Sequence, residues 1–429
     1  MKKKITVSTA ITIAIIAMTV TFSVTMILAR ELFDRTIPSV KEKESMYSKI
    51  AEIDKYVRAN YYGDITDATL YDMIGYGYVL GTGDKNASYY TARQFKELLD
   101  IQKGSLIGIG VDVVKDASGL ARIIAVYDGS PAEELGLQVG GFITTIEGAD
   151  VKTMNKDTVI AKLRGEAGTE AHFGYMAPDG VTADHAVNRS AYIVPSVDFA
   201  MLEENCGYIR ILRFDSTTLN QFSRAINDLQ DFGAKALVID LRDNAGGLLQ
   251  AATDCLDLLV PSGDLVWAQY KDGEQNLLGE SDDSSVDLPI VVMVNRNTAS
   301  SAELFAADLR EFSGAQIIGE KTMGKGTIQG EPHRMSDGSA VVITVAKMLT
   351  GNGESFDGVG VPVDLEVAPK PGTENSEGDY AHDTMVQQAV TLAKVTAGVP
   401  LEPTPSAEPS ESGAADSTSQ ADDEGQPAE

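Results

Sequence analysis

Between residues 193 and 369, short apolar runs alternate with amphipathic stretches, and this alternation constrains the fold more than any other feature of the chain. The apolar runs have the length of buried strands, and the amphipathic stretches have the period of helices that pack along one face. Alternating elements of this kind build a layered α/β structure whose functional groups gather in loops at the strand ends. We predict strands at 208–214, 236–241, 289–294 and 315–318, and helices at 217–232, 248–259 and 302–312.

The rest of the chain divides into segments that differ in residue composition and apolar pattern. Several segments are expected, because 429 residues exceed what one hydrophobic core usually organises. Residues 104–190 carry short β-rich runs between Gly, Pro and Asp turn signals, which predicts a compact β domain. Residues 31–103 are predicted to be mostly helical, and 191–400 form the α/β domain with a last helix at 383–397. The tail 401–429 is acidic, lacks Lys and Arg, and is predicted to be disordered.

The N-terminus combines a lysine cluster at 2–4 with an uncharged stretch at 5–29. In a helix that stretch would reach roughly 37 Å, which spans a bilayer core with some tilt. We therefore predict that residues 1–30 are an uncleaved single-pass anchor in the cell membrane. A cleavable signal peptide, which has a shorter apolar region, is the alternative. The lysines favour a cytoplasmic N-terminus, so everything after Arg30 is expected to be extracytoplasmic.

Composition narrows the possible partners and cofactors. A net charge of -28 argues against nucleic-acid binding, because proteins that bind nucleic acid neutralise phosphates with Lys and Arg. The four histidines are not spaced with Cys or acidic residues as metal ligands are, so we predict no metal site and no cofactor. Cys206 and Cys255 lie in apolar stretches where a free Cys acts as a small hydrophobe; the sequence does not decide whether they pair, and we favour free thiols.

Three predicted strand ends carry residues suited to chemistry. In the first, Asp240–Gly247, a buried strand runs into Gly246 and Gly247 just before a helix. Glycines let the backbone approach a ligand closely, and free N–H groups at a helix start favour an anion or a developing oxyanion. A tight strand-to-helix turn is the structural alternative.

The second strand end contains Ser300, again between a buried strand and a helix. Ser300 and Glu303 fit the capping box S-x-x-E, so a structural role as helix N-cap is one interpretation. In the other, Ser300 is a nucleophile, and the helix dipole and the free N–H of Ser301 stabilise the oxyanion that forms when Ser300 attacks a carbonyl.

The third strand end, Gly319–Gln329, nearly satisfies the phosphate-binding pattern G-x-x-x-x-G-K-[ST]. Gly326 replaces the hydroxyl residue that would hold magnesium, and no helix pattern follows, which argues against an NTPase. A serine nucleophile needs a base, and no histidine lies in a loop like that of Ser300. Lysine can act as the base when burial lowers its pKa, which the apolar, Gly-rich surroundings of Lys325 favour.

Taken together, these segments resemble the C-terminal processing peptidases, also called tail-specific proteases. The family pattern reads D-L-R-x-N-x-G-G after a strand, then V-N-x-x-[ST]-A-S-[AS]-[AS]-E, then G-E-x-T-x-G-K-G-x-x-Q. The corresponding segments here are Asp240–Gly247, Val294–Glu303 and Gly319–Gln329, in that order and at the family separations. The resemblance continues through Asp337–Ser339 and Gly358–Pro362 and covers most of residues 40–397.

The resemblance implies that Ser300 is the nucleophile, Lys325 the general base and Gln329 the residue that orients the lysine. It further implies an oxyanion hole formed by the backbone N–H of Ser301 and of one glycine of the pair 246–247, without saying which glycine. The implied fold is an α/β peptidase core of the crotonase-like or ClpP-like layered type, with an inserted β-rich PDZ domain and an N-terminal helical region.

The β-rich domain resembles a PDZ domain of the circularly permuted kind found in this family. Ser130–Leu137 resembles its helix-and-turn signature, although Gly140-Gly141 departs from the usual Gly-Asp turn. Arg164 is either a sensor that couples peptide docking to the active site or a plain surface arginine. The implied carboxylate-binding loop binds a free C-terminus through backbone N–H groups while the peptide adds as a strand. That loop consists of Gly108, Ile109, Gly110 and Val111.

The leading hypothesis is therefore a membrane-anchored, extracytoplasmic serine endopeptidase that binds protein C-terminal tails through its PDZ domain and cleaves with a Ser/Lys mechanism. A tethered PDZ binding module with an inactive peptidase domain is a second hypothesis. A crotonase-like acyl-CoA enzyme is a third, but no CoA-binding motif is found. The helical region 31–103 is compatible with homodimerisation, as in some relatives, and equally with simple packing.

Overall fold

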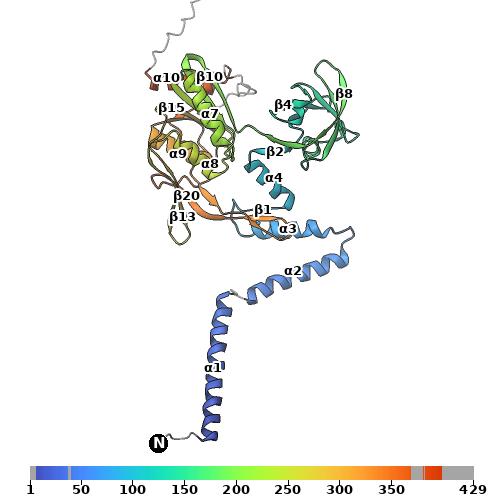
Figure 1. The fold of residues 1–429 in the computed structure, drawn as a ribbon, viewed down its shortest axis with the longest axis vertical. Coiled ribbons are helices and arrows are strands. Elements are labelled where there is room, and N and C mark those ends of the chain that lie inside the picture. The colour runs from blue at the N-terminus through green and yellow to red at the C-terminus, as the bar shows by residue number, and fades with distance from the viewer. Residues whose placement is uncertain (1–5, 37–39, 369–379, 381, 399–429) are drawn as a thin grey trace, which may run out of the picture. The chain divides into compact units, whose positions relative to one another are not determined.

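The computed structural model describes residues 6–36, 40–368, 380 and 382–398, so the predicted disordered tail 401–429 lies outside the described residues (Figure 1). The chain divides into two units, Met1–Gly77 and Tyr78–Glu429. Within its described residues the first unit contains three helices, the third of which continues into the second unit. These helices are α1 (Val7–Thr36), α2 (Val40–Asn60) and α3 (Asp67–Leu80).

Helix α1 contains a segment, Ile11–Arg30, that is long and apolar enough to cross a membrane, with a mean hydropathy of 2.3. Three of its hydroxyls are satisfied within the helix, because Thr12, Thr19 and Thr21 donate to backbone carbonyls one turn earlier. Such a helix suits either a signal peptide or a membrane anchor.

A small β domain is built around an antiparallel sheet of order β3-β4-β5-β7-β8, with β6 paired to β5. Its apolar core includes Val113, Ile123, Ile143 and Phe173, which point inward from alternate positions of their strands. Two helices accompany the sheet, α5 (Pro131–Glu134) and α6 (Lys156–Leu163). The strands are β3 (Val111–Lys115), β4 (Ala121–Val126), β5 (Phe142–Ile146), β6 (Ala149–Asp150), β7 (Glu170–Met176) and β8 (Thr182–Asn188).

The chain enters and leaves the β domain through two paired segments. Strand β2 (Ser105–Gly108) runs antiparallel to β9 (Ser190–Ile193). The residues that lead into β2 are hydrogen-bonded to the α/β domain. Ser216 N donates to the carbonyl of Gln102, and Val194 N donates to that of Gly104.

The α/β domain is a three-layer structure around a sheet of order β10-β11-β12-β15-β16-β21 (Figure 1). In this sheet β11, β12, β15, β16 and β21 run parallel to one another. Leu237 and Ile239 of β12 pack against α7, α8 and α9 on one face, whereas Val238 packs with α10 on the other. The strands are β10 (Val197–Leu202), β11 (Cys206–Ile211), β12 (Ala236–Asp240), β15 (Ile290–Val294), β16 (Gln316–Gly319) and β21 (Leu365–Glu366). The helices are α7 (Thr218–Asp231), α8 (Leu249–Asp257), α9 (Ser301–Ser313) and α10 (Thr384–Thr396).

Two smaller sheets complete this part of the chain. One has the order β14-β13-β20-β17 and the other the order β1-β19-β18. Helix α4 (Ala92–Gln102) follows β1 and begins at a complete capping box between Thr91 and Gln94. The strands are β13 (Gly263–Tyr270), β14 (Gln275–Ser281), β17 (Thr327–Gln329), β20 (Thr344–Thr350), β1 (Ser88–Tyr90), β18 (His333–Arg334) and β19 (Ala340–Val342).

The alternating strands and helices predicted between 193 and 369 are present, and the mixed α/β core with an inserted β domain and N-terminal helices is confirmed. The helix predicted at 383–397 corresponds to α10. Cys206 and Cys255 are buried and free, and burial raises the pKa of the Cys206 thiol to about 12.

Candidate active site

The three sequence segments meet at one edge of the main sheet. Strands β12, β15 and β16 are adjacent and parallel, and they end at Asp240, Val294 and Gly319. The loops that follow these strands are hydrogen-bonded to one another, because Thr298 Oγ1 donates to Leu241 O at 2.8 Å and Met323 N donates to Thr298 O at 3.0 Å. The carboxyl ends of parallel strands thus bring together residues that are far apart in the sequence.

The Asp-Leu-Arg part of the first segment has a structural role in this fold. Arg242 binds Asp240 at 2.6 Å and Asp383 at 2.8 Å, and all three side chains are almost fully buried. Asp383 also accepts from the backbone N–H groups of Met385 and Val386, which start α10. This ion-pair network therefore joins the end of β12 to α10.

Asn244 shapes the glycine loop beside the second segment. Its Nδ2 donates to Ile211 O and its Oδ1 accepts from Gly246 N, both at 2.8 Å. Its backbone carbonyl accepts from Ala299 N at 2.9 Å, which joins the glycine loop to the residue before Ser300. Asn244 is fully buried. Sequence reasoning did not single it out, although it lies inside the family pattern.

Ser300 adopts a strained backbone conformation at the start of α9. Its φ is 58° and its ψ is −125°, in the region that side chains other than glycine rarely occupy. Such strain costs on the order of 1–3 kcal/mol and concentrates at functional sites. Gly246 lies against it, because a Cβ there would come within 3.0 Å of Ser300 Cβ.

Glu303 connects the nucleophile candidate to the base candidate. Its Oε2 accepts from Ser300 N at 2.9 Å and from Lys325 N at 2.8 Å. Its Oε1 accepts from Gly324 N at 2.6 Å and from the Thr322 hydroxyl at 2.5 Å. The carboxylate is completely buried, and four donors satisfy it without a cation. The sequence identified Glu303 only as a capping partner, because its contacts with the third segment depend on the tertiary fold.

Lys325 lies half-buried in the loop after β16. Burial lowers the pKa of its ammonium group below the ordinary value, and the Glu303 carboxylate opposes that shift. The loop packs closely on the segment at 356–361: Gly358 N donates to Gly324 O, and Gly326 N donates to Asp357 Oδ1. The lysine is therefore held in a partly desolvated loop, where burial disfavours its charged form.

Gln329 lies on β17, four residues after Lys325. Its Nε2 donates to the hydroxyls of Thr327 at 3.1 Å and Thr344 at 3.3 Å. Strand β17 pairs with β20, and Met348 N of β20 also donates to Gly326 O beside the lysine. The same strand thus supports both Lys325 and Gln329.

The hydrogen bonds distinguish the two glycines of the proposed oxyanion hole. The N–H of Gly246 is engaged by Asn244, whereas the N–H of Gly247 donates to no acceptor among the described residues. Gly247 has a φ of 146°, and a Cβ there would lie 2.0 Å from Phe214 O. Ser301 is the first residue of α9, so its N–H has no acceptor within the helix.

In the β domain, the loop predicted to bind a carboxylate turns at Gly110. Gly110 has a φ of 86°, and its carbonyl accepts from Tyr127 N at 3.0 Å. The N–H group of Gly110 donates to no acceptor within the described part of the chain. Arg164 caps α6 and forms an isolated antiparallel bridge with Gly108, so it lies beside this loop with an exposed side chain.

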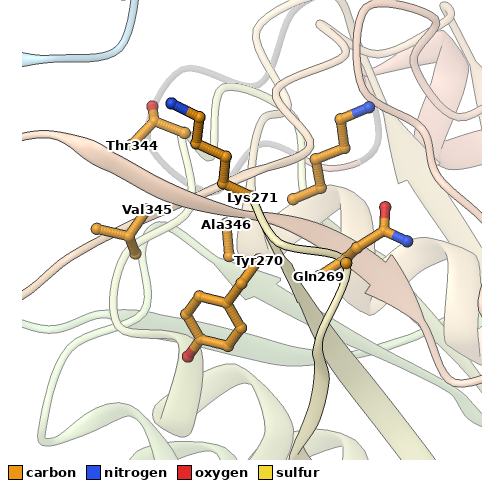
Figure 2. A pocket seen from close by; sticks show the side chains of 8 residues that line it. Gln269, Tyr270, Lys271, Thr344, Val345 and Ala346 are labelled. Atoms are coloured by element: carbon orange, nitrogen blue, oxygen red, sulfur yellow. The ribbon is translucent and has the colours of Figure 1, made fainter.

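A pocket of about 500 Å³ opens on the smaller sheet that carries β17 (Figure 2). Its walls come from the end of β13 and the turn after it, and from the first half of β20. One of the residues that line the pocket is Thr344, whose hydroxyl accepts a hydrogen bond from Gln329. The lining residues are Gln269, Tyr270, Lys271, Gly273, Thr344, Val345, Ala346 and Lys347.

Comparison with known proteins identifies the family. The family model "Peptidase family S41" matches residues 205–367, and a "PDZ domain" model matches 122–173. The carboxy-terminal processing protease CtpA of Bacillus subtilis is 32% identical over 344 residues, which cover 80% of this chain and 72% of that protein. The carboxyl-terminal-processing protease of Synechocystis sp. is 32% identical over 314 residues, covering 72% of this chain and 73% of that protein.

Among solved structures, a photosystem II D1 C-terminal processing protease is 30% identical and covers 68% of this chain and 80% of its own, with a TM-score of 0.42. The sequence identity to these curated relatives extends over most of both chains. The chain belongs to peptidase family S41 and is a carboxyl-terminal processing serine protease with a PDZ domain.

Proposed function

We propose that this protease cleaves peptide bonds with Ser300 as nucleophile and Lys325 as general base. The observation that carries the proposal is the buried Glu303 carboxylate, whose single oxygen Oε2 accepts from the backbone N–H groups of both residues. This contact holds the two backbones close together. The lowered pKa of Lys325 supports its role, because a base must be neutral to accept a proton.

In this mechanism the neutral amine of Lys325 takes the hydroxyl proton of Ser300, which attacks the scissile carbonyl to form an acyl-enzyme. The leaving amine receives the proton, and Lys325 then activates a water that releases the acyl group. The oxyanion is stabilised by the N–H groups of Ser301 and Gly247, because Gly246 N is already bound to Asn244. Gln329 orients the lysine.

For substrate selection, we propose that the loop Gly108–Val111 binds the C-terminal carboxylate of a protein tail through backbone N–H groups, while the tail adds as a strand. Arg164, beside Gly108, is proposed to sense the docked tail. The core is proposed to be of the crotonase-like or ClpP-like layered type, with the domain limits 104–190 and 191–400 given by the sequence.

We also propose that α1 is an uncleaved anchor, with the lysines at its start in the cytoplasm and the protease domain outside the cell membrane. A homodimer is proposed on the exposed apolar side chains that α2 and α3 carry, since exposed apolar patches mark interaction sites. The most exposed of these side chains are Tyr47, Tyr56, Tyr71, Tyr78 and Leu80.

The decisive experiment compares cleavage of one quenched-fluorescence peptide, with a free or an amidated C-terminus, by wild type, Ser300→Ala and Lys325→Ala. Both variants are expected to lose at least about 10³-fold in kcat, because the residues of a nucleophile–base pair act as a unit. Wild-type turnover in either variant would refute the assignment of that residue. An inactive wild-type protein that still binds the free C-terminus would favour the tethered binding module. Equal cleavage of the two peptides would argue against tail recognition.

A further inference from the structure

A turn that precedes the β domain reaches the sheet that carries Gln329. It follows α3, and its own hydrogen bonds order it: Asp84 N donates to the Thr82 hydroxyl and Asn86 N donates to Asp84 Oδ1 at 3.0 Å. The side chains of Asp84 and Asn86 are partly buried, whereas Lys85 between them is exposed. The turn therefore directs two polar side chains into the protein.

Both side chains bind the residues that contact Gln329. Asp84 Oδ2 accepts from Thr344 N at 2.8 Å, and its Oδ1 accepts from the Thr344 hydroxyl at 3.0 Å. Asn86 Nδ2 donates to the Thr327 hydroxyl at 2.9 Å. These two hydroxyls are the acceptors of the Gln329 amide nitrogen.

The direction of these bonds fixes the orientation of the Gln329 amide. A carboxylate has no proton to donate, so the Thr344 hydroxyl must donate its single proton to Asp84. Its lone pairs then face Gln329, which can present only its NH₂ group. The carbonyl oxygen of Gln329 is left for a donor elsewhere. In the proposed mechanism that donor is the Lys325 amine or ammonium group.

Asp84 stays ionised in this position. Burial would raise the pKa of its carboxyl group, but hydrogen bonds from Thr344 and Asn86 outweigh it and hold the pKa below its ordinary value. The acceptor character that sets the bond directions is thus kept at neutral pH.

We propose that Asp84 and Asn86 are positioning residues that act through Thr344 and Thr327 to hold Gln329 in the orientation that serves Lys325. This inference rests on the proposed function. It makes the turn between α3 and β1 part of the catalytic apparatus, although that turn lies outside the residues matched to the peptidase family, 205–367.

The test is a double-mutant cycle on the full chain in detergent, with the free-C-terminus peptide as probe. Asp84→Asn alone is expected to lower kcat about tenfold to a hundredfold with little change in KM, since small displacements of catalytic groups cost on that order. In the Gln329→Ala background the same substitution is expected to add nothing, because Asp84 acts through Gln329. Equal and multiplicative losses in both backgrounds would overturn the inference.

The pH profile supplies a readout that a merely structural role would not move. Loss of the Gln329 acceptor destabilises the Lys325 ammonium, so the rising limb of kcat should move to lower pH in Asp84→Asn. Lys85→Ala, in the same turn, is the matched control and should leave both kcat and the limb unchanged. An unshifted limb in a folded Asp84→Asn protein with wild-type kcat would refute the inference.

Thr344 provides a second test if Asp84→Asn does not fold, as judged by thermal melting. Thr344→Ser keeps the hydroxyl and should retain turnover far closer to wild type than Thr344→Val, which keeps the shape alone. Equal turnover in the two variants would count against the inference. Failure of the proposed mechanism gives a different result: Ser300→Ala would still cleave, or Gln329→Ala alone would match wild type.

Discussion

Among single residues, Glu303 departs most from its sequence interpretation. A buried carboxylate with four donors and no cation is stable because hydrogen bonds to the charged form replace its hydration. The capping-box pattern predicted only its bond to Ser300. The bonds to the lysine loop were not predictable, because no local pattern in the sequence places residue 303 beside residue 325.

The same residue sets a pH prediction. Activity should rise with pH as Lys325 loses its proton, and the midpoint should lie below the ordinary lysine value of 10.5 because burial lowers that pKa. Glu303 raises the pKa of Lys325, so Glu303→Gln should move the midpoint of kcat/KM to still lower pH, with reduced turnover.

A pH–rate series for wild type, Glu303→Gln and Glu311→Gln checks this. Glu311 is exposed on the same helix and serves as the matched control, with an unchanged midpoint. A midpoint in Glu303→Gln above that of wild type would contradict the assigned electrostatics.

At the scale of elements, the parallel strands β12, β15 and β16 and their helices were predictable because buried apolar runs and amphipathic periods are local properties. The hairpin of β13 and β14 was not predicted. Residues 275–278 of β14 are exposed, and strands without a clear apolar alternation give a weak signal.

A stability prediction belongs to the link between β12 and α10. Arg242→Met removes the cation from Asp240 and Asp383, and breaking a buried pair in this way should cost about 3–5 kcal/mol of unfolding free energy. Urea unfolding measures the loss, and hydrogen exchange should show α10 opening first.

The matched control is Arg296→Met, which removes an ion pair with Glu320 whose arginine side chain is 73% exposed. Exposed pairs contribute at most about 1 kcal/mol, so this variant should unfold near the wild-type midpoint. Equal destabilisation by the two substitutions would show that the Arg242 network is not what holds α10.

At the scale of the whole molecule, we expect the N-terminal apolar helix to determine membrane attachment and the protease domain to determine activity. A protein lacking residues 1–30 should be soluble and should cleave the free-C-terminus peptide with wild-type kcat, because the site residues all lie in the second unit. The full chain should remain in membranes after alkaline carbonate extraction.

N-terminal sequencing of the membrane-bound protein distinguishes the anchor from a signal peptide. An intact N-terminus supports the anchor, whereas a chain that begins after α1 would show that the segment is removed. Loss of activity on truncation, with the fold intact by circular dichroism, would contradict the independence of the two parts.

The sequence by itself determined the class of chemistry and the α/β architecture, because strand-end motifs and apolar periods are written in neighbouring residues. It could not show which of Gly246 and Gly247 keeps a free backbone N–H, since that depends on which of the two N–H groups donates to Asn244. Nor could it join Asn86 to Thr327, 241 residues away, or Asp84 to Thr344, 260 residues away. Such contacts form only when the whole chain packs, because a side chain's hydrogen-bond partners are set by which surfaces the fold brings together.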